Sequence, residues 1–245
     1  MNATEQIDYF QQIVEIQLEN IALSLKTKKN NRNTFILQFN NSVYELFNST
    51  FLLLNGKYLE SGGTILSSLW ERNLTLEYIY LDFESRKSTY QNHNKLKKSP
   101  WKIFQMVKEI TDLQNHPTLS NNLKFNLYYI QYTYLCAIKH GNPHTFSYLN
   151  REGNHSVIGL KIFDESVDKD LITFFKVQAL TIGLEFISNY YSFSKDDKMT
   201  RFINYINIDF TNFVKVLDLN VPKIINAEES EYDEEPWNYF DNLQE

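Results

Sequence analysis

Glycine and proline, the residues that most often form tight turns, are scarce in this chain. There are 7 Gly and 5 Pro among 245 residues. β-Sandwiches and barrels need a turn signal about every 8–12 residues, so this scarcity disfavours both and favours long helices. Apolar residues spaced three and four apart support helices from the start of the chain. On the first segment they are Ile7, Phe10, Val14, Leu18, Ile21 and Leu25.

The same periodicity continues along most of the chain and is interrupted by short polar segments. We expect helices over about residues 4–28, 34–55, 57–83, 86–96, 100–113, 120–140, 167–193 and 194–219. The sequence therefore predicts an all-α fold, a single helical bundle of about seven to eight helices in one domain, residues 1–226. We expect residues 227–245 to form a mobile acidic tail.

Local signals set the expected helix ends. Asn2 and Glu5 have the spacing of a capping box. Gly56 suits a left-handed helix end. Ser99-Pro100 is typical of an N-cap followed by proline at the first helical position, and Ser194 is the expected start of the last helix.

Gly62 and Gly63 lie inside the predicted helix over residues 57–83. Two glycines destabilise a helix. We therefore expect another helix to pack closely against this turn.

Composition places the chain among globular proteins. Hydrophobic residues make up 42%, too many for a disordered chain. The single cysteine, Cys136, excludes an intramolecular disulfide and a cysteine zinc cluster. Residues 1–15 lack the features of a signal peptide, and uninterrupted apolar runs are too short to span a bilayer. We expect a cytoplasmic protein with no membrane association, and the abundance of Asn, Lys and Ile is typical of an AT-rich bacterial or phage genome.

The net charge of −6 is unevenly distributed. Residues 227–245 hold eight acids and no base, which leaves 24 bases and 22 of the 30 acids in the rest of the chain. Bases gather in residues 26–32 and 86–108. Such stretches either contact nucleic-acid phosphates or form ordinary solvated faces. The tail also carries Trp237 and Phe240, which suits a segment that docks on a protein partner.

The usual sequence signatures of catalysis are absent. There is no glycine-rich phosphate loop, no nucleophile elbow and no pair of histidines at metal spacing on a helix. We expect no cofactor and no metal site. The classical dinucleotide-binding, kinase and hydrolase functions, which depend on these motifs, are set aside.

Two polar groups of residues are candidates for chemistry. The first is Glu71-Arg72, in the middle of the longest predicted helix. A buried charge must be paired, so this dipeptide either forms an ion pair that orients neighbouring helices or lines a polar site in the bundle.

The second candidate group is Lys139-His140 with the following Asn142. A histidine in the last turn of a helix is stabilised in its cationic form by the helix dipole, which is an ordinary capping role. Histidine is also the side chain best suited to proton transfer near neutral pH. With Lys139 or Arg72 nearby, His140 could support attack of a ribose hydroxyl on a phosphate.

The stretch from residue 56 to residue 143 resembles an uncharacterised all-helical bacterial family, a domain of unknown function. In that family an arginine begins the first motif. Here Ser67 stands at that position, whereas Glu71 and His140 match. The segments that carry the resemblance are residues 67–71, 76–79, 128–134 and 139–143.

The chain is more distantly similar to HEPN domains, helical bundles that often act as metal-independent ribonucleases in toxin–antitoxin and phage-defence systems. Their signature is an arginine a few residues before a histidine near a helix end. No arginine has that spacing before His140, and only Lys139 adjoins it. The similarity implies a helical bundle with a candidate site at His140. Since such enzymes usually form the site between two protomers, it also implies a homodimer.

These observations lead to two functional hypotheses. In the first, the chain is a HEPN-like protein of a bacterial defence system of the abortive-infection or toxin–antitoxin type, and a metal-independent endoribonuclease acting on RNA. His140 is then the acid/base, Arg72 or Lys139 contacts phosphate, and Glu71 orients these side chains. In the alternative, the chain is a non-catalytic interaction or scaffold protein that docks a partner through its surface or its acidic tail. A third hypothesis joins the two: the tail shields the basic stretches by imitating nucleic-acid charge.

Overall fold

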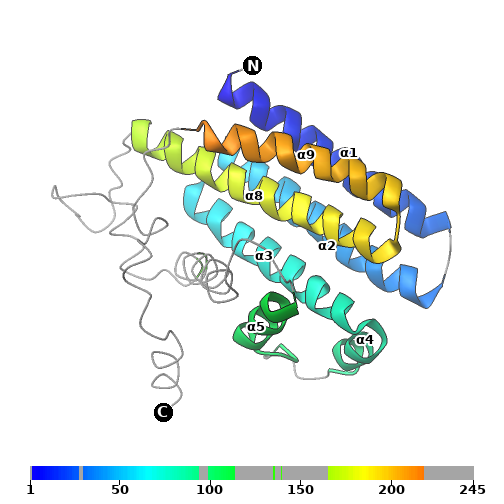
Figure 1. Ribbon diagram of the computed structural model, residues 1–245. Coiled ribbons are helices and arrows are strands. Elements are labelled where there is room, and N and C mark those ends of the chain that lie inside the picture. Colours follow the sequence, from blue (N-terminus) through cyan, green and yellow to red (C-terminus); the bar gives the residue numbers. More distant parts are fainter. Residues whose placement is uncertain are drawn as a thin grey trace, which may run out of the picture.

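Helices dominate the part of the chain that the computed structural model describes, residues 2–27, 30–93, 99–113, 135, 139 and 165–217. Seven helices have defined bounds and no strand occurs among these residues, which confirms the all-α prediction (Figure 1). The helices are α1 (Ala3–Thr27), α2 (Asn31–Asn55), α3 (Leu59–Leu81), α4 (Phe83–Gln91), α5 (Ile103–Leu113), α8 (Glu165–Ser194) and α9 (Asp197–Lys215).

Three predicted segments fall largely or wholly outside these residues. They are the helix over 120–140, the connection over 144–166 and the acidic tail 227–245. Within the first of them, Leu135 and Lys139 are described and both are helical.

Helix α8 lies at the centre of the bundle. It contacts α1, α2, α3 and α9, while α2 packs between α1 and α3. α4 and α5 contact α3 at the edge of the molecule (Figure 1). The helices therefore form one bundle around α8.

The central position of α8 explains its composition. A helix surrounded by other helices is apolar on all faces, and residues 169–194 are long and apolar enough to cross a membrane. A search for uninterrupted apolar runs misses this property, because scattered polar residues divide the segment. The core helix of a soluble bundle has the same length and composition, and packing against four helices accounts for them here.

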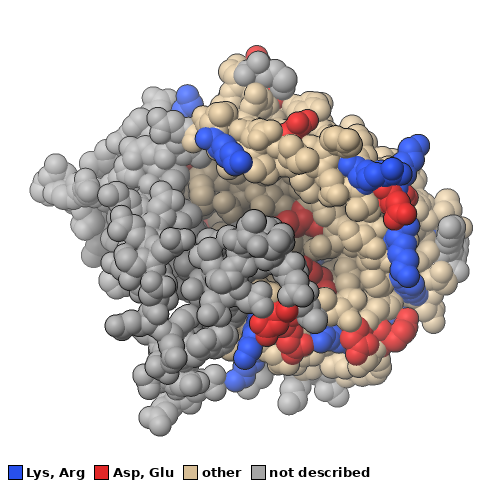
Figure 2. Space-filling model, viewed as in Figure 1, with Lys and Arg blue, Asp and Glu red and all other residues tan. Residues whose placement is uncertain are grey.

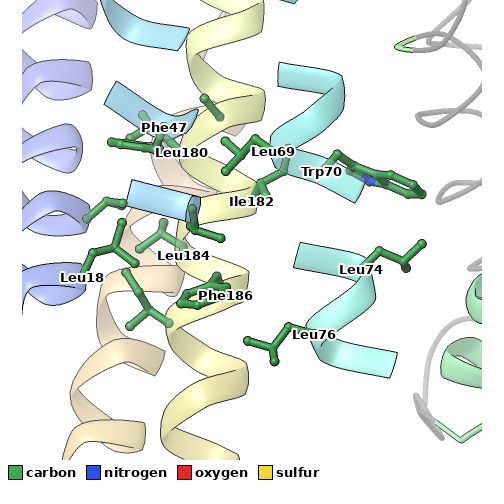
Figure 3. Close-up of a cluster of buried hydrophobic side chains, with 14 of the residues drawn as sticks. Leu18, Phe47, Leu69, Trp70, Leu74, Leu76, Leu180, Ile182, Leu184 and Phe186 are labelled. Carbon is green, nitrogen blue, oxygen red and sulfur yellow. The ribbon is translucent and has the colours of Figure 1, made fainter. Parts of the chain in front are cut away.

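Helix α3 is buried on two sides. Leu69 and Leu76 point toward α8, whereas Trp70 and Leu74 point away from it (Figure 3). All four side chains are buried. Two buried sides leave only narrow flanks of α3 for partly exposed polar side chains.

Close packing of α2 on α3 explains the glycines of α3. A Cβ atom at Gly62 would lie 2.6 Å from Cδ2 of Leu54 in α2, a separation that real contacts do not show. Gly62 and Gly63 are both buried. The prediction that another helix packs tightly against this turn is confirmed.

The capping box at the start of α1 is confirmed. The Glu5 backbone N–H donates to Oδ1 of Asn2 at 2.9 Å, and the Asn2 N–H donates to Oε2 of Glu5 at 2.8 Å. α2 begins earlier than predicted because Asn30 caps it, accepting from the Asn33 N–H at 2.7 Å.

Two other predicted helix ends are wrong, and a third is right in position but not in conformation, since α2 ends at Asn55 as expected. Gly56 has φ −77°, and Lys57 takes the left-handed conformation with φ 63°. α5 begins at Ile103 and not at the proline after Ser99. Ser194 ends α8, and Asp196 caps α9 by accepting from the Met199 N–H at 3.0 Å.

Candidate functional site

An ion pair joins two of the residues that the sequence singles out. Nζ of Lys139 lies 3.0 Å from Oε1 of Glu71, although the two residues are 68 positions apart. Glu71 lies on a flank of α3, between the two buried sides of that helix. The side chains are 34% and 28% exposed for Glu71 and Lys139 respectively. Both charged groups therefore remain accessible from solvent while they hold each other in place.

Arg72 has a different set of partners. Consecutive residues of an α-helix diverge by about 100°, so Arg72 points away from the direction of Glu71. Its Nη1 donates to the Tyr90 hydroxyl of α4 at 3.0 Å, and its guanidinium lies 5.5 Å from the ring centre of Phe39 in α2. The structure thus brings Glu71 and Lys139 together and directs Arg72 toward α2 and α4. His140 and Asn142 lie outside the described residues.

The arginines of the two basic stretches are engaged in the fold. The guanidinium of Arg86 lies 3.7 Å from the ring centre of Tyr78, and it donates to the Tyr78 carbonyl at 2.8 Å and to Glu109 at 2.6 Å. This arginine ties α3, α4 and α5 together. Arg32 lies over the Phe193 ring at 4.3 Å. At these two positions the observed contacts are structural.

The electrostatics of Glu109 fit the same structural role. Burial raises the pKa of its carboxyl, but hydrogen bonds from Gln105 and Tyr78 and the charge of Arg86 outweigh burial and lower the pKa overall. The carboxylate is therefore the favoured form beside Arg86.

A groove that the sequence analysis did not predict lies between α3, α8 and α9. Its volume is about 450 Å³. Figure 2 shows acidic side chains set back in the hollowed part of this face. The polar groups that line the groove include Glu77, Glu185, Ser188, Asn189, Asn207 and Thr211.

Glu185 is an acid of the groove with a strongly shifted pKa. Burial raises the pKa of its carboxyl from 4.5 to about 7. Nδ2 of Asn73 lies 3.5 Å from Oε2 of Glu185, at the outer limit of a hydrogen bond. A carboxyl with this pKa can both take up and release a proton near neutral pH. The signal in the sequence is a single glutamate inside the apolar segment 179–187.

The comparisons add no relative. No protein-family model, no curated protein and no solved structure matches this chain. Within the described part of the chain, no group of three or more His, Cys, Asp or Glu side chains is arranged to hold a metal ion.

Proposed function

We propose that the chain is a HEPN-like helical protein of a bacterial defence system that cleaves RNA without a metal ion. The observation that supports this proposal most is the Lys139–Glu71 ion pair. It joins the residue directly before His140 to the middle of α3, and so links the two motifs on which the family resemblance rests.

Each residue has a defined role in this proposal. His140 takes the proton of a ribose 2′-hydroxyl, whose oxygen attacks the adjacent phosphorus. The bond from phosphorus to the 5′-oxygen breaks, and that oxygen takes a proton from the His140 imidazolium. Lys139 stabilises the developing negative charge. An ammonium has three N–H donors and Glu71 accepts one of them, which leaves two for phosphate oxygens. Glu71 positions Lys139. Of the two candidate cations, Lys139 and not Arg72 contacts the phosphate in this proposal.

Expression in a bacterial host tests the proposal. Growth and the integrity of total RNA are compared for the wild type, His140→Ala and a control, His93→Ala, which changes a histidine outside the motif. We expect growth arrest and RNA cleavage with the wild type and with the control, and neither with His140→Ala. Normal growth and intact RNA with folded wild-type protein would contradict the proposal.

A second candidate function is supported by a separate observation. Several large apolar side chains are exposed on α1 and α9, and exposed apolar side chains that lie together mark interaction surfaces. In this alternative the chain is a non-catalytic interaction protein that docks a partner through this surface or through the tail 227–245. Pull-downs with and without the tail test the second route: loss of a partner with retained helical content would support it.

A further inference from the structure

The groove between α3, α8 and α9 opens on a side of α8 that the described helices leave uncovered. α8 packs against α1, α2, α3 and α9, and the groove lies over α8 between α3 and α9 (Figure 2). Three polar residues of α8 line it, and their spacing of four and three places them in one row along the helix: Thr181, Glu185 and Ser188. Polar residues that interrupt the apolar segment of α8 therefore share one side, and that side faces the groove.

The carboxyl of Glu185 lacks a positive partner in the part of the chain that the structure describes. Its side chain is half-buried and lines the groove. Its Oε2 has a long contact of 3.5 Å with Nδ2 of Asn73, and no ion pair among the described residues includes it. An unpaired carboxylate is costly away from water. A cation bound in the groove would therefore stabilise the ionised carboxyl.

Other polar groups of the groove offer hydrogen-bond acceptors. Nδ2 of Asn207 donates to the Ser188 hydroxyl at 3.0 Å, which leaves Oδ1 of this amide as an acceptor. Glu77 of α3 adds a second carboxyl, and its side chain is buried. Lys215, in the last turn of α9, is the one cationic side chain of the described lining. This balance favours a ligand with N–H donors and positive charge over an anion.

The rest of the described lining suits a hydrocarbon chain. Leu184 of α8 and Phe210 and Val214 of α9 are apolar. The volume of about 450 Å³ is within the range of about 300–1,000 Å³ found for small-molecule sites. Mg²⁺ and Ca²⁺ take about six or more oxygen ligands, whereas this lining combines two carboxyls with apolar walls. The walls therefore favour an organic cation over a metal ion.

We propose that the groove binds a small aliphatic amine, with the ammonium on the Glu185 carboxylate and the hydrocarbon chain against Leu184, Phe210 and Val214. An ammonium has three N–H donors and no acceptor. One N–H can meet Glu185, and the acceptors beside it, such as Oδ1 of Asn207, can take another.

This site is separate from the proposed nuclease site. Two residues of an α-helix turn through about 200°, so Asn73 is on the opposite flank of α3 from Glu71. Amine binding therefore does not depend on the Lys139–Glu71 pair or on cleavage of RNA, and either proposal can fail alone.

Binding of the amine should release a proton from Glu185. Burial raises the pKa of this carboxyl to about 7, and an ammonium binds the ionised form. The other charged side chains of the described lining are Glu77 on α3 and Lys215 on α9. If the ammonium binds only the ionised carboxyl, the fraction of protein that is competent to bind rises about tenfold between pH 6 and pH 8. The affinity should rise with it.

Calorimetric titration of the full-length protein tests the proposal. The probe is putrescine, an aliphatic diamine, and pentanol is the neutral control of similar length. The variants are Glu185→Gln and the control Glu45→Gln, at an exposed glutamate of α2. We expect putrescine to bind the wild type and Glu45→Gln alike, and pentanol to bind neither. Glu185→Gln should weaken putrescine binding about tenfold or more and abolish the rise in affinity with pH.

A second variant tests the groove without changing its charge. Thr211 is exposed on α9 and lines the groove, so Thr211→Trp places an aromatic ring in the space that the hydrocarbon chain would occupy. We expect this variant to keep the helical content of the wild type and to lose putrescine binding.

Four results would overturn the proposal. One is a folded wild type that shows no saturable binding of putrescine. Another is equal affinity of the wild type and Glu185→Gln, which would place the amine elsewhere. The third is binding of pentanol as tight as that of putrescine, since the groove would then be only an apolar site. The last is a wild type that binds Mg²⁺ in competition with putrescine but loses neither ligand in Thr211→Trp.

Discussion

Two neighbouring residues of α3 have different surroundings because of helix geometry alone. Glu71 turns toward Lys139, and Arg72, one position later, turns toward Tyr90 and Phe39. α3 is buried on two sides, and Glu71 and Arg72 occupy the flanks between them. A pair that looks like one unit in the sequence is thus divided between two sites.

The Lys139–Glu71 ion pair should contribute little to stability. Both side chains are about one third exposed, and exposed ion pairs are worth about 0.2–1 kcal/mol. In a double-mutant cycle of Glu71→Gln and Lys139→Met, we expect a coupling free energy in this range from urea unfolding. A coupling free energy of several kcal/mol would contradict this expectation and show that the ion pair is important for the stability of the fold.

Glu185 should make the stability of the fold depend on pH. Burial raises the pKa of its carboxyl from 4.5 to about 7, so between these values the folded state holds a proton that the unfolded state has released. The free energy of unfolding therefore falls as pH rises through this window. Glu185→Gln removes this effect, and we expect it to stabilise the protein by on the order of 2 kcal/mol above pH 7 and by little at pH 4.

The control for this measurement is Glu45→Gln, a change at an exposed glutamate of α2. It should leave the pH dependence of unfolding as in the wild type. If Glu185→Gln shows that same pH dependence, the carboxyl of Glu185 ionises in the folded protein as it does in water.

At the scale of elements, the junction between α8 and α9 depends on a few local interactions. Lys195 takes a left-handed conformation with φ 57°, and Asp196 then caps α9. This two-residue turn allows α9 to fold back along α8. The cap lies two residues later than the serine that the sequence pattern favours, because the hydroxyl of Ser194 donates to the Tyr191 carbonyl within α8.

Removal of this cap should destabilise the protein measurably. Asp196→Ala deletes the acceptor of the Met199 N–H, and loss of an N-cap costs about 1 kcal/mol. Asp197→Ala, one position later, removes a similar charge from the first turn without removing the cap. Thermal unfolding should show a clearly larger loss for Asp196→Ala than for Asp197→Ala, and equal losses would mean that only charge matters.

At the scale of the whole molecule, the sequence predicts the helices much better than the sites. Periodicity identifies α1, α2, α3 and α9 because each buries a regular apolar pattern, whereas α8 is identified by its long apolar segment. The glycines of α3 indicate a close neighbour before that neighbour is known. Helix ends are predicted less well, since competing caps such as Ser194 and Asp196 lie within a few residues of each other.

The sites depend on contacts between distant segments, which periodicity does not contain. The Lys139–Glu71 pair spans 68 positions, and the groove around Glu185 needs three helices in a particular order. A single acid inside an apolar helix is the one sign of the groove that the sequence offers.

Cleavage of RNA by the purified full-length protein is the most direct test of the central claim, that a metal-independent site forms next to the Lys139–Glu71 pair. Wild type, His140→Ala and Lys139→Met are incubated with RNA in the presence of a metal chelator. We expect the wild type to cleave RNA to products with cyclic phosphate ends, Lys139→Met to cleave it more slowly, and His140→Ala to leave it intact. RNA that stays intact with folded wild-type protein, or that His140→Ala cleaves at the wild-type rate, would contradict the account.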